Sequence, residues 1–386
     1  MTLSSRSPAG ETPVPDGLVL PRYGSGALCD VVPSILGALG LEGERNVLGL
    51  PEANRYVVLL IDGLGWNLLH RHAADAPYLS SLAATRDPVT VGVPSTTSTS
   101  LVSLGTGLPP GVHGVVGYTI AIPGTDRLLN TLRWDTTVEP LLWQPYPTAF
   151  ERAENAGVAV SMVARKAFRG SGVTVAGLRG GDYVPADSAG QLTAGAVEAS
   201  QRGSRSLVYA YEGDLDWTGH REGVNGPAWR HQLAAIDHLA QRLRGALPAD
   251  AVLVLTGDHG MVDVPLGRRV DVDSDPALRS GVYLVGGDPR LRYLYTEAGA
   301  TDDVVAAWRN RVGDDAIVVP RDDAVERGWF GTVEDRVLPR LGDVIIASRE
   351  DFAVECAREF PMESTMLGWH GSLTADEMLV PLLVAD

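Results

Sequence analysis

Short, unbroken runs of aliphatic and β-branched residues recur along the chain, and they restrict its fold more than any other feature. In chain order these runs lie at residues 56–65, 157–164, 206–214, 251–260 and 343–348. Apolar runs without polar alternation are typical of strands that are buried on both faces of a parallel sheet. Helical patterns separate them, the clearest being residues 226–247 with Pro227 near its start. This alternation predicts an α/β fold with a mostly parallel central sheet and helices on both faces.

Two segments interrupt the alternation. Residues 265–342 are rich in Arg, Asp, Gly and Pro and contain a helix-like stretch at 301–313, so they predict a small α+β insertion, a cap. Residues 111–157 predict a second, loop-rich insertion. We therefore expect a catalytic core of residues 21–264 and 343–386, a cap insertion of residues 265–342, and a flexible N-terminal arm of residues 1–20.

The net charge of the chain limits the kinds of molecule that it is expected to bind. The 386 residues carry a formal net charge of −16, which should repel extended nucleic acid and anionic membrane surfaces. A small anionic substrate stays compatible with this charge if the site supplies its own cations. Cys29 and Cys356 are too few for a disulfide framework, and residues 1–20 contain no apolar segment of the secretory kind. We expect a soluble cytoplasmic protein with free thiols, and its oligomeric state stays open.

Acidic residues and histidines follow the predicted strands. Asp62 ends the first strand, and Asp258 and His259 end the fourth. Ligands of an open α/β sheet gather at the carboxyl ends of its strands. A single Asp at such a place is more often a turn former or a helix cap, so neither position is decisive alone.

Two further places add to this pattern. Asp214, Asp216 and His220 follow the third strand, and the four-residue spacing of the last two lets both side chains reach one cation from a single helical turn. The alternative is a solvated acidic loop. His370 stands between Trp369 and Gly371, where a lone His is more often a packing residue. These residues indicate a metal site only because they all occur in one chain.

A run of hydroxyls follows Pro94, because six of the seven residues at 95–101 are Ser or Thr. The run predicts the start of a helix, where free backbone N–H groups and the helix dipole favour a bound phosphate. The alternative is an N-cap on a Ser/Thr-rich helix packed on the sheet. Beside bound metal ions, a hydroxyl in this run would act as an alkoxide nucleophile.

These motifs, in this order, resemble the alkaline phosphatase superfamily, and most closely its type I phosphodiesterase/nucleotide pyrophosphatase branch. The resemblance is carried by "IDGLG", "PSTTSTSLVSLGTGLPPGVHG", "DLDWTGH", "TGDHGM" and "WHG". It implies an alkaline-phosphatase-like fold and two bound Zn²⁺ ions, although Mn²⁺ or Fe would suit the same ligands. The implied ligands are Asp62, Thr97, Asp258 and His259 for one ion, and Asp216, His220 and His370 for the other. Thr97 is implied as the nucleophile because it stands three residues after Pro94 and ten before Gly107.

The implied reaction is hydrolysis of phosphodiester or pyrophosphate bonds in small nucleotide-like substrates, through a phosphothreonine intermediate. Ser100 stands where this branch usually has Asn, three residues after the nucleophile, and we expect Ser100 or a backbone N–H to hold a phosphoryl oxygen. The sequence contains no Cys-x-Pro-x-Arg motif, which disfavours a sulfatase. The candidates for stacking on a nucleobase, or for ordinary packing, are Tyr118, Trp134, Tyr209, Tyr211 and Trp217.

Two alternatives stay open. A phosphomonoesterase or phosphonate hydrolase of the same superfamily would share every metal ligand. From another class, a metal- or nucleotide-binding protein without turnover would keep the ligands and lose the chemistry.

Overall fold

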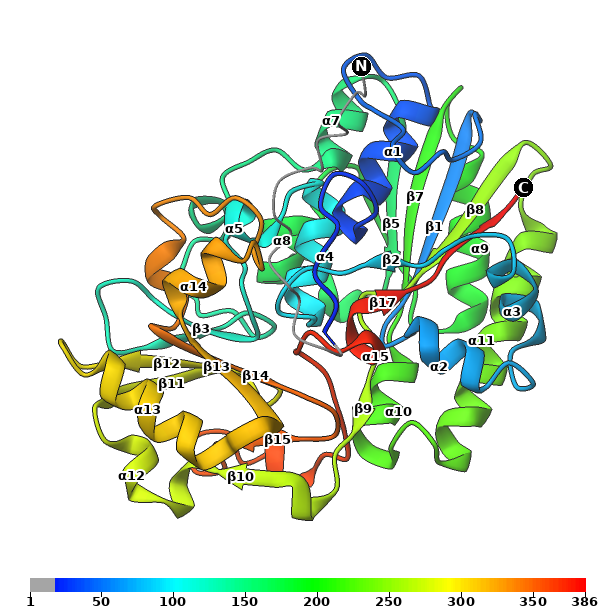
Figure 1. Ribbon diagram of the computed structural model, residues 1–386. Helices are drawn as coiled ribbons and strands as arrows, with labels where there is room; N and C mark the ends of the chain where they lie inside the picture. The colour runs from blue at the N-terminus through cyan, green and yellow to red at the C-terminus, as the bar shows by residue number, and fades with distance from the viewer. Residues whose placement is uncertain (1–17) are drawn as a thin grey trace, which may run out of the picture.

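A six-stranded sheet forms the centre of the computed structural model, which describes residues 18–386 (Figure 1). Its strand order is β18-β8-β1-β7-β5-β6. Every pairing is parallel except that of β18, which joins β8 in the antiparallel sense. The strands are β1 Arg55–Ile61, β5 Ala159–Ala164, β6 Asp182–Pro185, β7 Ser206–Glu212, β8 Ala251–Thr256 and β18 Leu382–Ala385. The sheet confirms the predicted α/β class, and β1, β5, β7 and β8 form where the apolar runs predict them.

Helices cover both faces of this sheet. Tyr56, Val58 and Leu60 of β1 pack into one core, and the alternating residues between them pack into another. One face is covered by α1 Val31–Ala38, α4 Thr97–Thr106, α7 Ala149–Asn155 and α8 Gly172–Gly177. The other is covered by α2 Trp66–Arg71, α3 Pro77–Ala83, α9 Ala189–Ser200, α10 Asp214–Glu222 and α11 Pro227–Ala246. Because helices bury both faces of the sheet, the sequences of its strands are continuous apolar runs.

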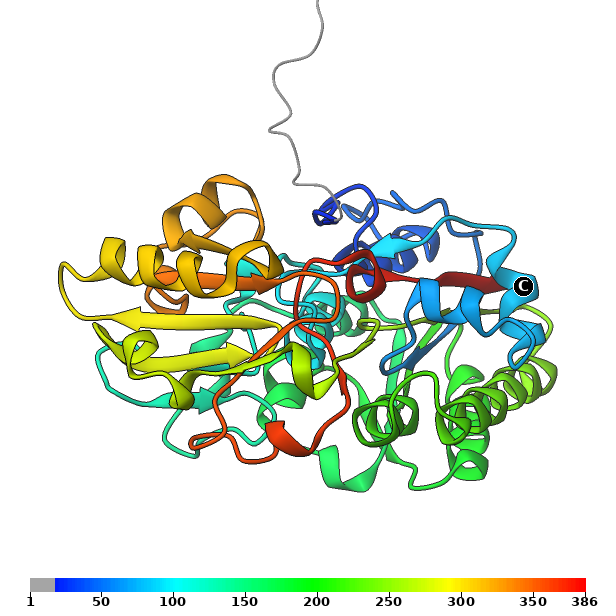
Figure 2. The same ribbon diagram turned by 60° about the horizontal axis from the view of Figure 1, so that its bottom comes forward.

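A second, antiparallel sheet lies beside the first, with α4 between the two (Figures 1 and 2). Its order is β11-β12-β14-β13, and α13 Thr301–Val312 packs on it where the helix was predicted. The strands are β11 Val282–Asp288, β12 Leu291–Thr296, β13 Ala316–Pro320 and β14 Val344–Ser348. The shorter elements are α5 Pro110–His113, α6 Pro140–Trp143, α12 Pro276–Arg279, α14 Arg321–Glu326, α15 Ala375–Met378, β2 Val89–Thr90, β3 Thr119–Ala121, β4 Leu128–Asn130, β9 Val262–Asp263, β10 Arg269–Asp271, β15 Ala353–Glu355, β16 Gly368–Trp369 and β17 Leu379–Val380.

One predicted strand lies in a different sheet from the one expected. Residues 343–348 were expected to return to the parallel core, but β14 pairs with β12 and β13 in the antiparallel sheet. Val344 and Ile346 pack under α13, and Ile345 and Ala347 pack into the core that α4 shares. Because both faces of β14 are buried, its sequence has the same continuous apolar pattern as a parallel strand. A boundary at residue 342 would therefore cut through this sheet.

The start of the chain was expected to form a flexible arm over residues 1–20. Residues 1–17 lie outside the described part of the chain. Of the remainder, Val19 donates its N–H to the carbonyl of Leu373 at 2.8 Å, and Leu18 forms a bridge with Thr374. Among the helices of residues 18–386, none combines the length and apolar character that a membrane span requires.

A buried ion pair joins the second sheet to the C-terminal segment. Arg290, in the turn between β11 and β12, donates to both carboxylate oxygens of Glu377 at 2.9 and 2.6 Å, and both side chains are fully buried. Glu377 also accepts from the N–H of Ser372 at 3.0 Å and the hydroxyl of Thr374 at 2.5 Å. Such a fully satisfied pair is tolerated inside a protein, whereas either partner alone is a buried, uncompensated charge.

We predict that Arg290→Met lowers the free energy of unfolding by about 3–5 kcal/mol, because it leaves Glu377 buried without its cation. Urea unfolding followed by circular dichroism measures the change. Arg71→Gln is the matched control, because Arg71 pairs with the neighbouring Asp376 at the surface, and its loss should cost less than about 1 kcal/mol. Equal losses in the two variants would contradict this role for the buried pair.

Candidate active site

Three adjacent parallel strands bring the candidate acids to one edge of the sheet. Asp62 directly follows β1, Asp258 follows β8, and Asp216 lies in α10 after β7. β1 lies between β7 and β8, and the register aligns Ile61 with Glu212 and Leu60 with Thr256. The strand ends therefore coincide, and the side chains that follow them converge.

The first group consists of Asp62, Asp258 and His259. Nε2 of His259 lies 3.3 Å from Oδ1 of Asp62 and 3.6 Å from Oδ2 of Asp258, and all three side chains are buried. Thr97, the first residue of α4, places its Oγ1 3.1 Å from the same Nε2. Thr96 instead donates its hydroxyl to Asp288 at 3.2 Å. The structure thus brings Thr97, and not Thr96, to the first group.

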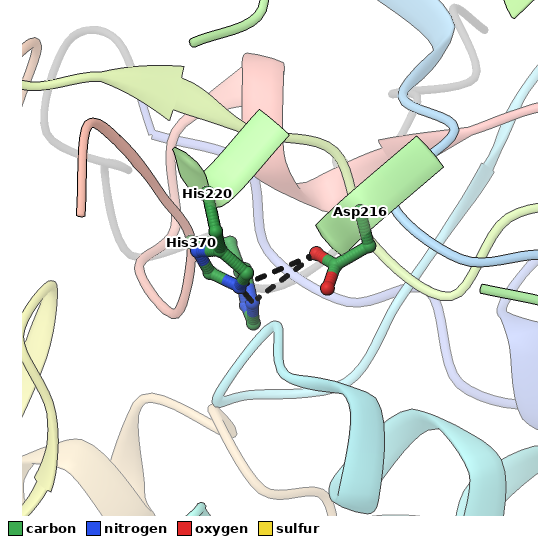
Figure 3. A group of neighbouring side chains, drawn as sticks. All are labelled: Asp216, His220 and His370. Carbon is green, nitrogen blue, oxygen red and sulfur yellow. Dashed lines mark hydrogen bonds and ion pairs between the residues drawn. The ribbon is translucent and has the colours of Figure 1, made fainter. Parts of the chain in front are cut away.

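The second group consists of Asp216, His220 and His370 (Figure 3). Oδ1 of Asp216 lies 3.4 Å from Nε2 of His220 and 3.8 Å from Nε2 of His370. α10 supplies the first two residues, four positions apart, as the spacing predicts. His370 arrives from a distant part of the chain because β16 pairs with β9, the strand that follows His259. Its ring stacks on that of His259 at 3.5 Å, so the two groups are neighbours.

The hydrogen-bonding state of both groups fits bound cations. Each His faces a backbone carbonyl with Nδ1, at 2.8 Å for His220, 3.0 Å for His259 and 2.9 Å for His370. A carbonyl cannot donate, so Nδ1 carries a proton and Nε2 is the ring nitrogen that can bind a cation once it is deprotonated. The Nε2 atoms of His220 and His370 face each other at 3.3 Å. Buried oxygens without a hydrogen-bond partner face these nitrogens, namely Oδ1 of Asp62, Oδ1 of Asp216 and Oδ2 of Asp258.

The pKa shifts in the site also fit bound cations. Burial raises the pKa of Asp216 and of Asp258 well above the ordinary range, and the charge of Asp62 raises both further. For His259, burial disfavours the charged form, but Asp258 and Asp62 outweigh it and raise the pKa to about 10. The protein alone therefore holds these groups only by protonating some of them. A divalent cation in each group would let the carboxylates stay ionised.

A network of hydrogen bonds joins the loop before Thr97 to the loop that contains His370. The backbone of Ser95 bonds to both His370 and Gly371: its carbonyl accepts from the ring Nδ1 of His370 at 2.9 Å, and its N–H donates to the carbonyl of Gly371 at 3.1 Å. Its hydroxyl donates to the carbonyl of Ser372 at 2.7 Å. From the end of β11, Asp288 accepts from Thr96 and from the N–H of Tyr118 at 3.3 Å. Thr97 and His370 are therefore positioned together.

A cavity of about 490 Å³ opens beside both groups, and Asp62, Thr97 and Asp216 form part of its wall. The rest of the wall is largely apolar and aromatic: Leu101, Leu132, Met162, Phe168, Val173, Leu178, Tyr183, Tyr209, Tyr211 and Trp217. Of the predicted stacking residues, Tyr118 and Trp134 are absent from this wall. Ser100 is fully buried outside it, so its contact with a phosphoryl oxygen stays a prediction. Asp214 lines the cavity and pairs with Arg165 instead of joining a metal group.

Tyr211 has a role that sequence reasoning missed. Its hydroxyl donates to Oδ2 of Asp62, so this carboxylate is held at one oxygen while the other faces His259. Tyr211 lies in β7, which pairs with β1, and this pairing was not predicted from the sequence. Asp288 also had no local signal, since it lies 192 residues from the hydroxyl that it accepts from.

The family model described as type I phosphodiesterase/nucleotide pyrophosphatase matches residues 56–373 of the chain. The chain belongs to this family. The resemblance to this branch of the alkaline phosphatase superfamily is confirmed, as is the predicted fold class. Family membership supports a hydrolase acting on phosphoesters as the enzyme class.

Solved structures share the fold. Murine ectonucleotide pyrophosphatase/phosphodiesterase 5, as an inactive variant in complex with AMP, aligns with a TM-score of 0.68 and 18% identity over 86% of this chain and 87% of its own. Phosphonoacetate hydrolase from Sinorhizobium meliloti 1021, in complex with phosphonoformate, aligns with a TM-score of 0.65 and 19% identity over 86% of this chain and 90% of its own.

Two curated phosphopentomutases match part of the chain. The protein from Idiomarina loihiensis is 26% identical over 191 residues, which are 48% of this chain and 46% of its own length. The protein from Chelativorans sp. is 31% identical over 194 residues, which are 48% of this chain and 44% of its own length. The chain thus spans about half the length of these relatives.

We predict that Tyr211→Phe weakens metal binding about tenfold, because Asp62 loses the partner that orients it. Zinc titration against a competing chelator measures the affinity. Tyr183→Phe is the control: it removes a hydroxyl from the same cavity, but that hydroxyl donates to the backbone carbonyl of Arg165. Unchanged affinity in Tyr211→Phe, or the same loss in both variants, would count against this role for Tyr211.

Proposed function

We propose that the protein is a di-metal hydrolase that cleaves phosphodiester or pyrophosphate bonds of small nucleotide-like substrates through a phosphothreonine at Thr97. The observation that carries the proposal is the position of Thr97: its hydroxyl lies 3.1 Å from Nε2 of His259, and it lines the cavity together with Asp62 and Asp216. A nucleophile, two sets of metal ligands and space for a substrate therefore meet at one place.

The six carboxylates and imidazoles divide into two ligand sets. Asp62, Asp258 and His259, with Thr97, would hold one ion, and the second group would hold the other. Oxygen and imidazole ligands without thiolate suit Zn²⁺, and also accept Mn²⁺ or Fe. Bound in these sets, two divalent cations would lower the pKa of a hydroxyl or water and neutralise charge on phosphoryl oxygens.

Thr97 performs the covalent step in this proposal. Its Oγ forms a bond to phosphorus, and the bond from phosphorus to the leaving ester oxygen breaks with its electron pair going to that oxygen. Water then attacks the phosphothreonine and the Thr97 hydroxyl is restored. Because Thr97 begins α4, first-turn N–H groups without intrahelical partners lie beside the phosphoryl oxygens.

Charge favours a small anionic substrate. The carboxylates of Asp62, Asp216 and Asp258 and a Thr97 alkoxide carry four negative charges, which two divalent cations neutralise. An anionic diester then meets a neutral site although the whole chain carries −16. An extended polyanion would meet the acidic surface instead.

The partial match with phosphopentomutases favours a second candidate. A phosphomutase passes a phosphoryl group to another hydroxyl of the sugar, so the group on Thr97 would move to an acceptor and not to water. The two candidates differ in the fate of the phosphoryl group. Release of inorganic phosphate or a nucleoside monophosphate supports hydrolysis, and a pentose phosphate isomer without net release supports the mutase.

We predict that Thr97→Ala lowers the turnover of bis-p-nitrophenyl phosphate by at least about 10³-fold, because the covalent step loses its oxygen. Thr97→Ser keeps a hydroxyl and should retain measurable turnover with a phosphoserine in its place. Release of p-nitrophenol measures the rate, and elemental analysis should find about two metal ions per chain in the wild type and both variants.

Three results would contradict parts of this proposal. Equal turnover by the wild type and Thr97→Ala would show that Thr97 is not the nucleophile. Turnover of p-nitrophenyl phosphate but not of the diester would show that the enzyme is a phosphomonoesterase. Metal and nucleotide bound without any turnover would indicate a binding protein.

A further inference from the structure

Most polar side chains that line the cavity already have partners. Tyr211 donates to Asp62, and Tyr183 donates to the carbonyl of Arg165. Ser171 donates to Thr174, which in turn donates to the carbonyl of Phe168. A substrate in this cavity therefore finds few free groups, and those few decide which substrate fits.

Arg165 is the one cationic side chain in the wall of this cavity, within the part of the chain that the structure describes. It directly follows β5, so it stands at the carboxyl end of a strand, like the metal ligands. One nitrogen, Nη2, donates to Asp214, and the other N–H groups of the guanidinium have no hydrogen bond among residues 18–386. The side chain is 45% exposed, which leaves the remaining donors accessible.

Two aromatic residues that line the same cavity as Arg165 are also exposed. Phe168, from the same loop, has 38% of its surface exposed and packs edge-on against Tyr211 at 5.7 Å. Trp217, in α10, has 51% of its surface exposed. Large aromatic side chains that stay open to solvent around a cation mark a surface suited to a ligand with an apolar body and an anionic end.

We propose that Arg165 is a specificity-determining residue, which selects phosphodiesters whose cavity-bound ester group carries a second anionic group, a carboxylate or a phosphate. The proposal rests on the function proposed for Thr97. With phosphorus at Thr97, the ester group lies along the aromatic wall and its anion accepts from the guanidinium. A planar guanidinium with several free donors suits both anions.

In this arrangement Asp214 competes with the substrate anion for the guanidinium of Arg165. Its carboxylate occupies part of Arg165 in the absence of substrate, and it is 44% exposed, so it can turn to solvent at little cost when a substrate anion arrives. A purely structural ion pair makes the opposite prediction, because loss of either partner would then harm the site in the same way.

The test uses three p-nitrophenyl aryl phosphates in which the aryl group is phenyl, 3-carboxyphenyl or 3-phosphonophenyl. Arg165→Gln should lower kcat/KM about tenfold for the two esters that carry a second anionic group and change that of the phenyl ester less than about twofold. Arg169→Gln is the matched control, because Arg169 is exposed on the same loop but does not line the cavity. Asp214→Asn should raise kcat/KM for the two esters with the second anionic group. The larger of the two effects identifies carboxylate or phosphonate as the preferred anion.

Calorimetric binding of phenylphosphonate and 3-carboxyphenylphosphonate keeps the test independent of turnover. Arg165→Gln should lose about tenfold affinity for the carboxylate only. Equal losses for the ligands with and without the second anionic group, or the same loss in Arg165→Gln and Asp214→Asn, would overturn the proposal. If no ester is hydrolysed but the binding difference persists, the hydrolase reaction fails while the role of Arg165 stands.

Discussion

The structure depends on a set of negative charges buried at the ends of β1, β7 and β8. Transfer of an ionised carboxylate into a protein interior costs several kcal/mol unless a cation or hydrogen bonds compensate it. Here the protein compensates the outer oxygens of Asp62 and Asp258 and the Nδ1 atoms of the three histidines, whereas the inner oxygens and the Nε2 atoms face one another. The unsatisfied inner atoms are the ones that a metal ion would bind.

The second sheet positions two loops of this centre, although none of its strands supplies a candidate metal ligand. Asp288 accepts from Thr96, the residue before Thr97, and Arg290 binds Glu377 in the segment that follows His370. Both lie at the turn between β11 and β12, so one hairpin fixes two loops that are far apart in the sequence. These contacts hold the small antiparallel sheet beside the α/β core, with α4 between them (Figure 1).

The positions of most candidate site residues could be predicted from the sequence, because each is fixed by its neighbours along the chain. Asp62, Asp258 and His259 follow strands, Asp216 and His220 share a helical turn, and Thr97 begins a helix, so each could be located from its neighbours. His370 could be placed only by resemblance, because its position depends on the pairing of β16 with β9. The sheet that contains β14 was predicted wrongly because burial on both faces erases the alternation that distinguishes antiparallel strands. Arg165 was not singled out, although it directly follows β5 as Asp62 directly follows β1.

If two metal ions complete this centre, anomalous X-ray diffraction from crystals of the zinc-loaded protein should locate both. We expect two peaks: one about 2 Å from Nε2 of His259 and the facing oxygens of Asp62 and Asp258, and one about 2 Å from Nε2 of His220 and His370 and Oδ1 of Asp216. Zinc-loaded crystals with no peak between these atoms, or with peaks only at surface residues, would contradict this expectation.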